Sequence, residues 1–379
     1  MAAAPPAIAD VEEVAQDFAR EVVRPLAPAL ARGGQPFPRE LVTEAARRGL
    51  CGLLVPGEYG GGDAGHLAFA SFVEAVAREC ASSAVVLDVQ VSVATEPIVV
   101  FGSEEQKRRY LPRLASGEMV GAFALTEPSS GSDAAALRTT ATRDGDDYVL
   151  RGSKAFITNA GGADLYLVAA RTGEHGARGI SAFLVEADTP GLRAGEPLRK
   201  MGLRGSWTAE LFLDDVAVPV QNMLGPEGAG FRIAMAALDS GRIGISAQAV
   251  GIAQGALDAA VAHLRRGNTA DHRDPPLLIA DMAAHVEAAR ALYRHAAATC
   301  DAGQPFTRAA AVAKLYATDA AMAVAHAAVE LCAPDSTSAD HPAAIRLRDA
   351  KACQIYEGTN QVQRLVIARH LLAGSGGKA

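Results

Sequence analysis

One carboxylate near the end of the chain has the residue type and the setting that proton abstraction requires. Glu357 lies in the segment Tyr356-Glu-Gly-Thr-Asn360, after helix-like residues 345–351 and before helix-like residues 361–369. A carboxylate at a break between two helices can project into a cleft, where partial burial raises its pKa toward working pH. A capping or surface glutamate is the commoner role, so the rest of the chain has to decide between the two readings.

A second segment whose residues could bind a ligand is rich in serine and glycine and runs from Phe123 to Asp133. Such a turn exposes N–H groups and hydroxyls that can bind phosphate or the edge atoms of a flavin, although it could also be only a well-capped loop. Farther along, Phe156 and Thr158 alternate on a β-rich run. A strand of this kind could back an isoalloxazine ring and hydrogen-bond its N5 atom.

A third motif resembles a nucleotide-binding fingerprint, but the residues before it do not fit that role. Residues 60–65 read Gly-Gly-Gly-Asp-Ala-Gly and fit G-x-G-x-x-G, with Asp88 at a suitable distance downstream. A dinucleotide fingerprint needs its turn directly after a strand, and here residues 56–59 intervene. The sequence therefore argues against a Rossmann site.

Composition narrows the partners and the compartment. The chain has 379 residues with 36 basic and 43 acidic side chains and no basic run, which disfavours nucleic acid and anionic membranes as partners. No targeting signal or long apolar run is apparent, so we expect a cytoplasmic protein. The cysteines are odd in number and never at metal-ligand spacing, so we predict no disulfide and no metal site; they are Cys51, Cys80, Cys300, Cys332 and Cys353.

The residue patterns divide the chain into three parts that must position these segments. Apolar residues recur at helical spacing up to about Leu114, short β-rich runs with turn signals follow to Leu224, and an alanine-rich helical pattern resumes at Gly228. We predict an α+β fold that is mostly α. Its domains would be helical at 1–118, an antiparallel sheet or small barrel at 119–225, and a helical bundle at 226–379.

Taken together, the segments resemble the acyl-CoA dehydrogenase family, and its short-chain members most closely. The resemblance implies a helical domain, a central β domain and a C-terminal four-helix bundle. It also implies FAD as cofactor, a homodimer or homotetramer, and an electron-accepting flavoprotein as partner. It covers nearly the whole chain through seven ordered blocks, which begin at Val55, Phe101, Ala124, Phe156, Met201, Leu238 and Tyr356.

The resemblance also assigns roles to residues. Glu357 would remove the α-proton of an acyl thioester while the β-hydride passes to flavin N5, and its backbone N–H and a ribityl hydroxyl would hold the enolate oxygen. Some relatives carry their base at the position of Gly241, so Glu357 has no rival here. FAD contacts are implied for Leu125, Thr126, Gly131, Ser132, Phe156, Thr158, Thr359 and Gln361. Asp239, Arg242 and Gly358 would line the substrate site, unless the first two form only a structural ion pair at a helix end.

Two segments depart from the family pattern. An Arg-x-x-Phe-Gly motif that grips the FAD diphosphate and adenine end is replaced by the shorter residues 264–276, where Arg265 or Arg266 could supply the missing arginine. A Gln-x-Leu-Gly-Gly-x-Gly motif that contacts the adenosine half is replaced by residues 330–337. The resemblance thus keeps the flavin-ring contacts and loses the adenosine contacts.

Three functions follow. The first is FAD-dependent dehydrogenation of a short acyl thioester, carried by coenzyme A or by an acyl-carrier protein. The second is a non-catalytic scaffold with a degenerate FAD site, and the third is a flavin oxidase or monooxygenase on the same fold. Retention of Glu357 favours the first, because a scaffold needs no base and such oxidases commonly lack it.

Overall fold

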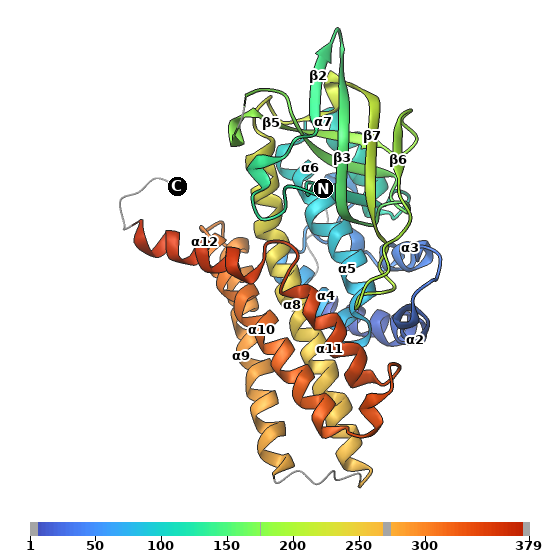
Figure 1. Cartoon of the computed structure of the whole chain (residues 1–379), viewed down its shortest axis with the longest axis vertical. Helices are drawn as coiled ribbons and strands as arrows, with labels where there is room; N and C mark the ends of the chain where they lie inside the picture. The colour runs from blue at the N-terminus through green and yellow to red at the C-terminus, as the bar shows by residue number, and fades with distance from the viewer. Residues whose placement is uncertain (1–6, 175, 268–273, 374–379) are drawn as a thin grey trace.

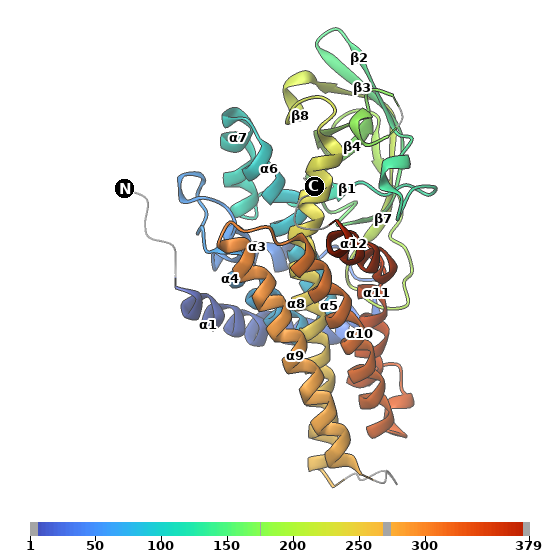
Figure 2. The same cartoon turned by 90° about the vertical axis from the view of Figure 1, so that its left-hand side faces the viewer.

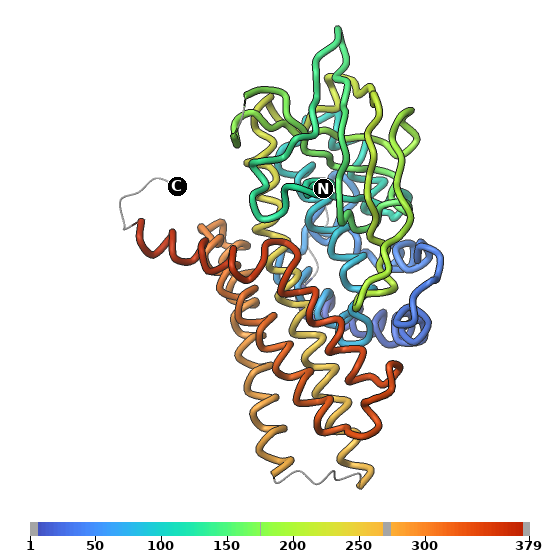
Figure 3. Tube along the Cα trace, in the orientation of Figure 1, coloured from blue at the N-terminus to red at the C-terminus, as the bar shows by residue number. Residues whose placement is uncertain are grey.

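A computed structural model describes residues 7–174, 176–267 and 274–373. The molecule is elongated, with a β-sheet at one end, a long helical bundle at the other, and the N-terminal helices packed between and beside them (Figure 1, Figure 3). Chain order and position correspond, because the blue, green and red thirds of the trace occupy separate regions (Figure 3). The described chain is therefore α+β and mostly α, as predicted.

The N-terminal part is entirely helical. The last of its helices begins with a capping box, in which Ser103 and Gln106 satisfy each other's backbone N–H groups. Its α-helices are α1 (Ile8–Phe18), α2 (Arg24–Arg32), α3 (Arg39–Arg47), α4 (Gly65–Glu79), α5 (Ala81–Val89), α6 (Glu96–Phe101) and α7 (Glu104–Ala115). A π-helical segment, Gln90–Thr95, joins α5 to α6.

The central sheet has the order β6-β7-β3-β2-β4-β5-β8, and β1 pairs with β4 off this path. A hairpin at Asp144 and Asp147 joins β2 to β3. The prediction of an antiparallel sheet or small barrel holds for most strand pairs, but the sheet is mixed, because β1 and β2 both run parallel to β4. The strands are β1 (Gly121–Ala124), β2 (Thr140–Asp144), β3 (Asp147–Thr158), β4 (Leu165–Arg171), β5 (Ile180–Glu186), β6 (Leu192–Ala194), β7 (Thr208–Pro219) and β8 (Met223–Leu224).

The C-terminal part is a bundle built around one long helix, α8. Helices α9, α10 and α11 pack on it, and α4 packs on its other side. An added Cβ at Gly251 of α8 would meet the Glu74 carbonyl oxygen at 2.5 Å, so glycine permits this close approach of α4. Helix α12 leaves the bundle and projects from the body (Figure 1, Figure 2). The helices are α8 (Gly230–Arg265), α9 (Pro275–Asp301), α10 (Thr307–Leu331), α11 (Pro342–Cys353) and α12 (Asn360–Leu372).

Two stretches are long and apolar enough to cross a membrane by length and composition alone, namely Ala81–Phe101 and Gly230–Arg265. In the folded chain 78% and 72% of their most apolar windows are buried, respectively. Both lie in the interior, where they line the junction of the N-terminal helices with the bundle. Their apolar character is therefore accounted for by the protein core.

Candidate active site

Glu357 lies in the connection between α11 and α12, the break that the sequence predicted. Its backbone is left-handed, with φ of 51°, and Gly358 follows at φ of 90°. The residue as a whole is partly exposed, yet its Oε2 atom is buried and has no hydrogen-bond partner within the described part of the chain. An Oε2 without a partner is unusual for a carboxylate and leaves it free to accept a proton.

Burial raises the pKa of Glu357 to about 7, although the positive charges of Arg242 and Lys314 act to lower it. A carboxylate in water has a pKa of about 4.3, so this one can take up a proton near neutral pH. Oε2 also lies against Gly241 of α8, where an added Cβ would stand far inside van der Waals contact with it. The helix surface at residue 241 must be bare for the carboxylate to occupy this place.

The loop that carries Glu357 is fixed from the bundle side. The buried Lys314 of α10 donates from Nζ to the Gly358 carbonyl at 2.8 Å and to the Asn360 Oδ1 at 3.0 Å. Gln363 Nε2 adds a 2.9 Å bond to the same Gly358 carbonyl. Burial lowers the pKa of Lys314 to about 8, so the charge is present at neutral pH but less firmly held than in water.

Asp239 and Arg242 form an ion pair on one face of α8, and Thr307 Oγ1 donates to Asp239 Oδ2 at 2.6 Å. The pair lies inside α8, which begins at Gly230, so the alternative of an ion pair at a helix end was wrong in its location. The helix begins two residues after Gly228, where the sequence predicts the helical pattern to resume, and Gly230 packs on the Ser181 backbone of β5. Arg242 is buried and its Nε has no partner among the described residues, which leaves a donor for a ligand.

A second carboxyl, Asp88 of α5, lies on the same side of α8 as Glu357. It is fully buried, Ser92 Oγ donates to its Oδ1 at 3.3 Å, and its Oδ2 has no partner among the described residues. Its Oδ1 rests against Gly244, one turn beyond Gly241. Burial and the charge of Glu357 raise the pKa of Asp88 well above its usual range.

The segment expected to meet the flavin is anchored by a buried ion pair. Lys154 of β3 donates to Glu127 Oε1 at 2.8 Å and to the Leu125 carbonyl at 3.2 Å. Glu127 also accepts the N–H groups of Arg138 and Thr139, and the Lys154 charge keeps its pKa low. Leu125 is buried, whereas Thr126 is partly exposed.

Phe156 projects from β3 at an irregularity in the sheet. The pairing of β3 with β7 shifts register between Lys154 and Ile157, and Ala155 donates instead to the Thr126 carbonyl at 2.8 Å. Phe156 takes φ of 58° and remains 66% exposed. A large ring held in a strained conformation and left bare is an aromatic face that a planar group can cover.

The remaining predicted contacts lie at the edges of this face. Gly131 and Ser132 are exposed beyond the tight turn in which Glu127 and Ser130 exchange backbone hydrogen bonds. Thr158 ends β3, partly exposed and paired with Thr208. Two further predicted contacts lie near Glu357 at the start of α12. Thr359 Oγ1 caps this helix by accepting the Val362 N–H at 3.2 Å, and Gln361 is exposed.

The predicted residues thus fall into two groups, which α5 connects. Asn159, next to Thr158, donates from Nδ2 to the Val86 carbonyl of α5 at 3.3 Å. Two residues later Asp88 faces Gly244, and Val93 packs near Gly241 beside Glu357. The flavin group at residues 125–158 and the carboxylate group at 239–244 and 357–363 therefore both contact the same buried helix.

The sequence did not identify three residues that the structure places here. Lys314, Lys154 and Asp88 are buried charged or acidic groups in contact with one of the two groups. Asp88 entered the sequence argument only through the false dinucleotide motif, and in the structure residues 60–65 follow a 3-10 turn rather than a strand. Each of the three contacts residues that are distant in the sequence, so a local sequence pattern cannot identify them.

The structure also locates the described parts of the two segments that depart from the family pattern, residues 264–276 and 330–337. Helix α8 ends at Arg265 and α9 begins at Pro275, while residues 268–273 lie outside the described residues. Residues 330–337 end α10 and form the 3-10 turn Asp335–Thr337. Arg265 and Arg266 are exposed, and the structure does not test whether either binds FAD.

Comparison with known proteins places this geometry in a family. The N-terminal, middle and C-terminal domain models of acyl-CoA dehydrogenases match residues 7–118, 122–216 and 228–372. An acyl-CoA dehydrogenase of Bacillus subtilis is 46% identical over 371 residues, covering 96% of this chain and 98% of the relative. The chain belongs to the acyl-CoA dehydrogenase family.

Solved structures agree. The butyryl-CoA dehydrogenase of Megasphaera elsdenii superposes with a TM-score of 0.92 at 42% identity, covering 96% of this chain and 98% of that chain. A chain from the structure of the electron-transferring flavoprotein of Acidaminococcus fermentans gives a TM-score of 0.93 at 44% identity, covering 96% and 97%. The predicted family and fold class are confirmed.

Proposed function

We propose that this protein is an FAD-dependent dehydrogenase that converts a short acyl-CoA to the α,β-unsaturated thioester. The observation that carries the proposal is the Glu357 carboxylate, which has an unpartnered, buried Oε2 and a pKa of about 7. The α-proton of a thioester is weakly acidic, so its removal needs a base with a pKa near working pH. The relationship to butyryl-CoA dehydrogenase supports a short acyl group.

The residues of the flavin group fit the ring half of FAD. The exposed Phe156 ring offers an aromatic face, Leu125, Thr126 and Thr158 lie beside it, and the exposed Gly131 and Ser132 offer donors for a phosphate. Thr359 and Gln361 are proposed to contact FAD from α12. When bound, FAD supplies the acceptor for the hydride that leaves the β-carbon.

The chain's own residues perform the proton chemistry and hold the thioester. Glu357 takes the α-proton on Oε2. Among the described residues its backbone N–H has no acceptor, so it is proposed to bind the thioester oxygen and stabilise the charge that develops there. Asp239, Arg242 and Gly358 line the same place, and Asp88 lies on the side formed by α5. The alternatives of a scaffold or an oxidase receive no specific support from this geometry.

An absorbance spectrum followed by anaerobic titration tests the proposal. We expect a purified protein with flavin absorbance that bleaches stoichiometrically on addition of butyryl-CoA. The same titration with a butyryl-carrier protein distinguishes the two carriers, and octanoyl-CoA tests the preference for a short chain. A flavin-loaded protein that no acyl thioester bleaches would refute the dehydrogenase. A protein that cannot be loaded with FAD would favour the scaffold.

Lys314 is a positioning residue, and its replacement should change the pH dependence of kcat/KM. Lys314→Met removes a positive charge that lowers the pKa of Glu357, so this pKa should rise. We expect the acidic limb of the kcat/KM profile to move to higher pH by about one unit, with activity at pH 7 about fivefold lower. The matched control is Lys351→Met, which removes an exposed lysine of α11. An unshifted limb with uniformly lower activity would reduce Lys314 to a structural role.

The partners and the compartment complete the proposal. Exposed leucines on the projecting helix α12, among them Leu365 and Leu372, support a homodimer or homotetramer formed with further copies of this chain. A monomer in sedimentation velocity would contradict this. We further propose an electron-transferring flavoprotein as the acceptor, as the likeness to the Acidaminococcus structure suggests. The five free thiols support a reducing, cytoplasmic location, which cell fractionation would test.

A further inference from the structure

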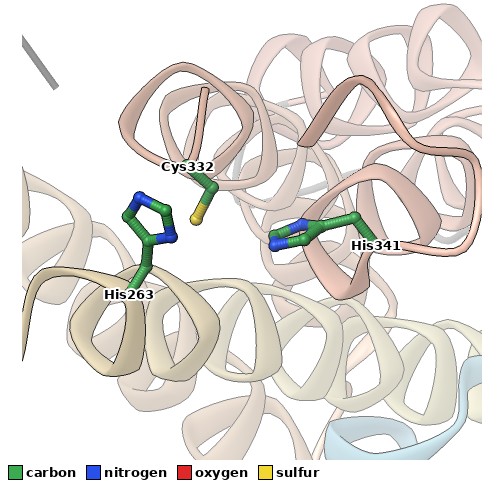
Figure 4. Close-up of side chains that lie close together, drawn as sticks. All are labelled: His263, Cys332 and His341. Carbon is green, nitrogen blue, oxygen red and sulfur yellow. The ribbon is translucent and has the colours of Figure 1, made fainter. Parts of the chain in front are cut away.

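Three side chains with metal-binding atoms converge at the end of the bundle that is remote from the sheet. They are His263 near the end of α8, Cys332 just after α10, and His341 just before α11. One ligand atom from each lies within 4.8 Å of the other two. Figure 4 shows the Cys332 sulfur between the two imidazole rings, with a ring nitrogen of each turned toward it.

The buried His263 ring of this cluster lacks the partner that a purely structural role would give it. His263 is 2% exposed, and its Nδ1 has no hydrogen bond among the described residues. Cys332 is fully buried, and its thiol makes only a long contact, at 4.0 Å, with the Ala259 carbonyl among the described hydrogen bonds. A buried imidazole nitrogen left bare costs free energy, which a ligand at this place would recover.

We propose that His263, Cys332 and His341 form a zinc site. One thiolate and two imidazoles are the ligands that Zn²⁺ takes in tetrahedral protein sites. Asp335, whose side chain is 59% exposed, has Oδ2 at 3.9 Å from His263 Nδ1 and would supply the fourth ligand. Metal–ligand bonds of about 2.0–2.3 Å place ligand atoms closer together than 4.8 Å, so the four groups must draw together on binding.

Protonation of the ligands must change on binding. His341 Nδ1 accepts the Ala343 N–H at 3.2 Å, which places the proton of the neutral ring on Nε2. Coordination through Nε2 moves that proton to Nδ1 and releases the bond from Ala343. The Cys332 thiol loses its proton when its sulfur binds, so one proton is released to solvent for each Zn²⁺ bound at neutral pH.

The site coincides with both departures from the family pattern. His263 immediately precedes the altered segment 264–276, and Cys332 and Asp335 belong to the altered segment 330–337. The cluster is far from the carboxylate, because 22 residues of α8 between Gly241 and His263 span about 33 Å. Zinc would therefore tie the ends of α8 and α10 to the start of α11 without entering the reaction, and it is expected to raise thermal stability.

Cobalt titration of the full-length, metal-stripped holoenzyme without an affinity tag tests the proposal. We expect one Co²⁺ per chain, with the strong visible bands of a tetrahedral site and a thiolate-to-cobalt charge-transfer band, all displaced by one equivalent of Zn²⁺. Cys332→Ser should abolish the charge-transfer band, and His341→Ala should weaken binding by about 100-fold. Cys51→Ser removes a remote buried thiol and should leave the spectrum unchanged.

Several outcomes would overturn the zinc site. One is the absence of stoichiometric cobalt binding in the wild-type holoenzyme, which requires no variant to fold. Another is a charge-transfer band that persists in Cys332→Ser. Zinc should also raise the wild-type Tm and leave that of His341→Ala unchanged, so equal shifts in both proteins would place the metal elsewhere.

Discussion

Glu357→Gln is expected to give a folded, flavin-containing protein that butyryl-CoA no longer bleaches. The amide has nearly the shape of the carboxylate but cannot accept the α-proton, so flavin reduction should slow by about 10³–10⁴-fold. Stopped-flow absorbance under anaerobic conditions measures this rate. The matched control is Glu287→Gln on the exposed side of α9, which should reduce at the wild-type rate. Flavin reduction at an undiminished rate in Glu357→Gln would assign the base elsewhere.

The same variant has a signature in stability. Burial raises the pKa of Glu357 to about 7, so between about pH 4.3 and pH 7 the folded protein holds a proton that the unfolded chain has lost. This stabilisation disappears as pH rises through 7, when a charge must be kept in a buried place. Glutamine carries no such cost. We expect the variant to gain about 3–4 kcal/mol over wild type at pH 8 and only about 1 kcal/mol at pH 5.

Denaturant unfolding of both proteins at the two pH values measures the difference. A gain that is equal at pH 5 and pH 8 would show that the pKa of Glu357 is not raised. It would not bear on the role of Glu357 as base, which the flavin-reduction rate tests separately. The two measurements therefore separate the electrostatic account of the site from its chemistry.

Gly241→Ala is expected to cost about 100-fold in kcat/KM while FAD remains bound. The new Cβ would stand where Glu357 Oε2 lies and within 2.9 Å of Val93 Cγ1, so the carboxylate must move. A displacement of about 1 Å at a reacting group is enough for a loss of this size. The helix itself should tolerate the change, since alanine favours a helix by about 1 kcal/mol over glycine.

A double variant identifies the cause of this loss. Combining Gly241→Ala with Glu357→Asp shortens the carboxylate by one methylene and relieves the clash, so the two losses should be less than additive. Gly173→Ala is the control, because its added Cβ would meet its nearest neighbour at an ordinary 3.5 Å. Full activity in Gly241→Ala would mean that Glu357 does not work from the position described.

Local patterns in the sequence determined whether each segment is helical or β-rich, and they identified the Glu357 carboxylate as the main candidate for catalysis. The carboxylate break at residues 356–360, the β-rich run at 155–158 and the helical alternation on either side depend on neighbours a few residues apart, so they can be read without tertiary contacts. The ordered blocks added the family, which the comparisons confirmed. The domain boundaries and the individual site roles stay predictions.

Only the tertiary structure shows which side chains, distant in sequence, lie together at the active site and at the proposed zinc site. Lys314 reaches the Gly358 carbonyl across 44 residues, and Asp88 meets Gly244 through the packing of α5 on α8. The expectation that no metal site exists rested on cysteine spacing along the chain, whereas His263, Cys332 and His341 come together only where three helix ends meet. Residue type and local spacing fix what a side chain can do, but burial and long-range packing fix its pKa and its partners.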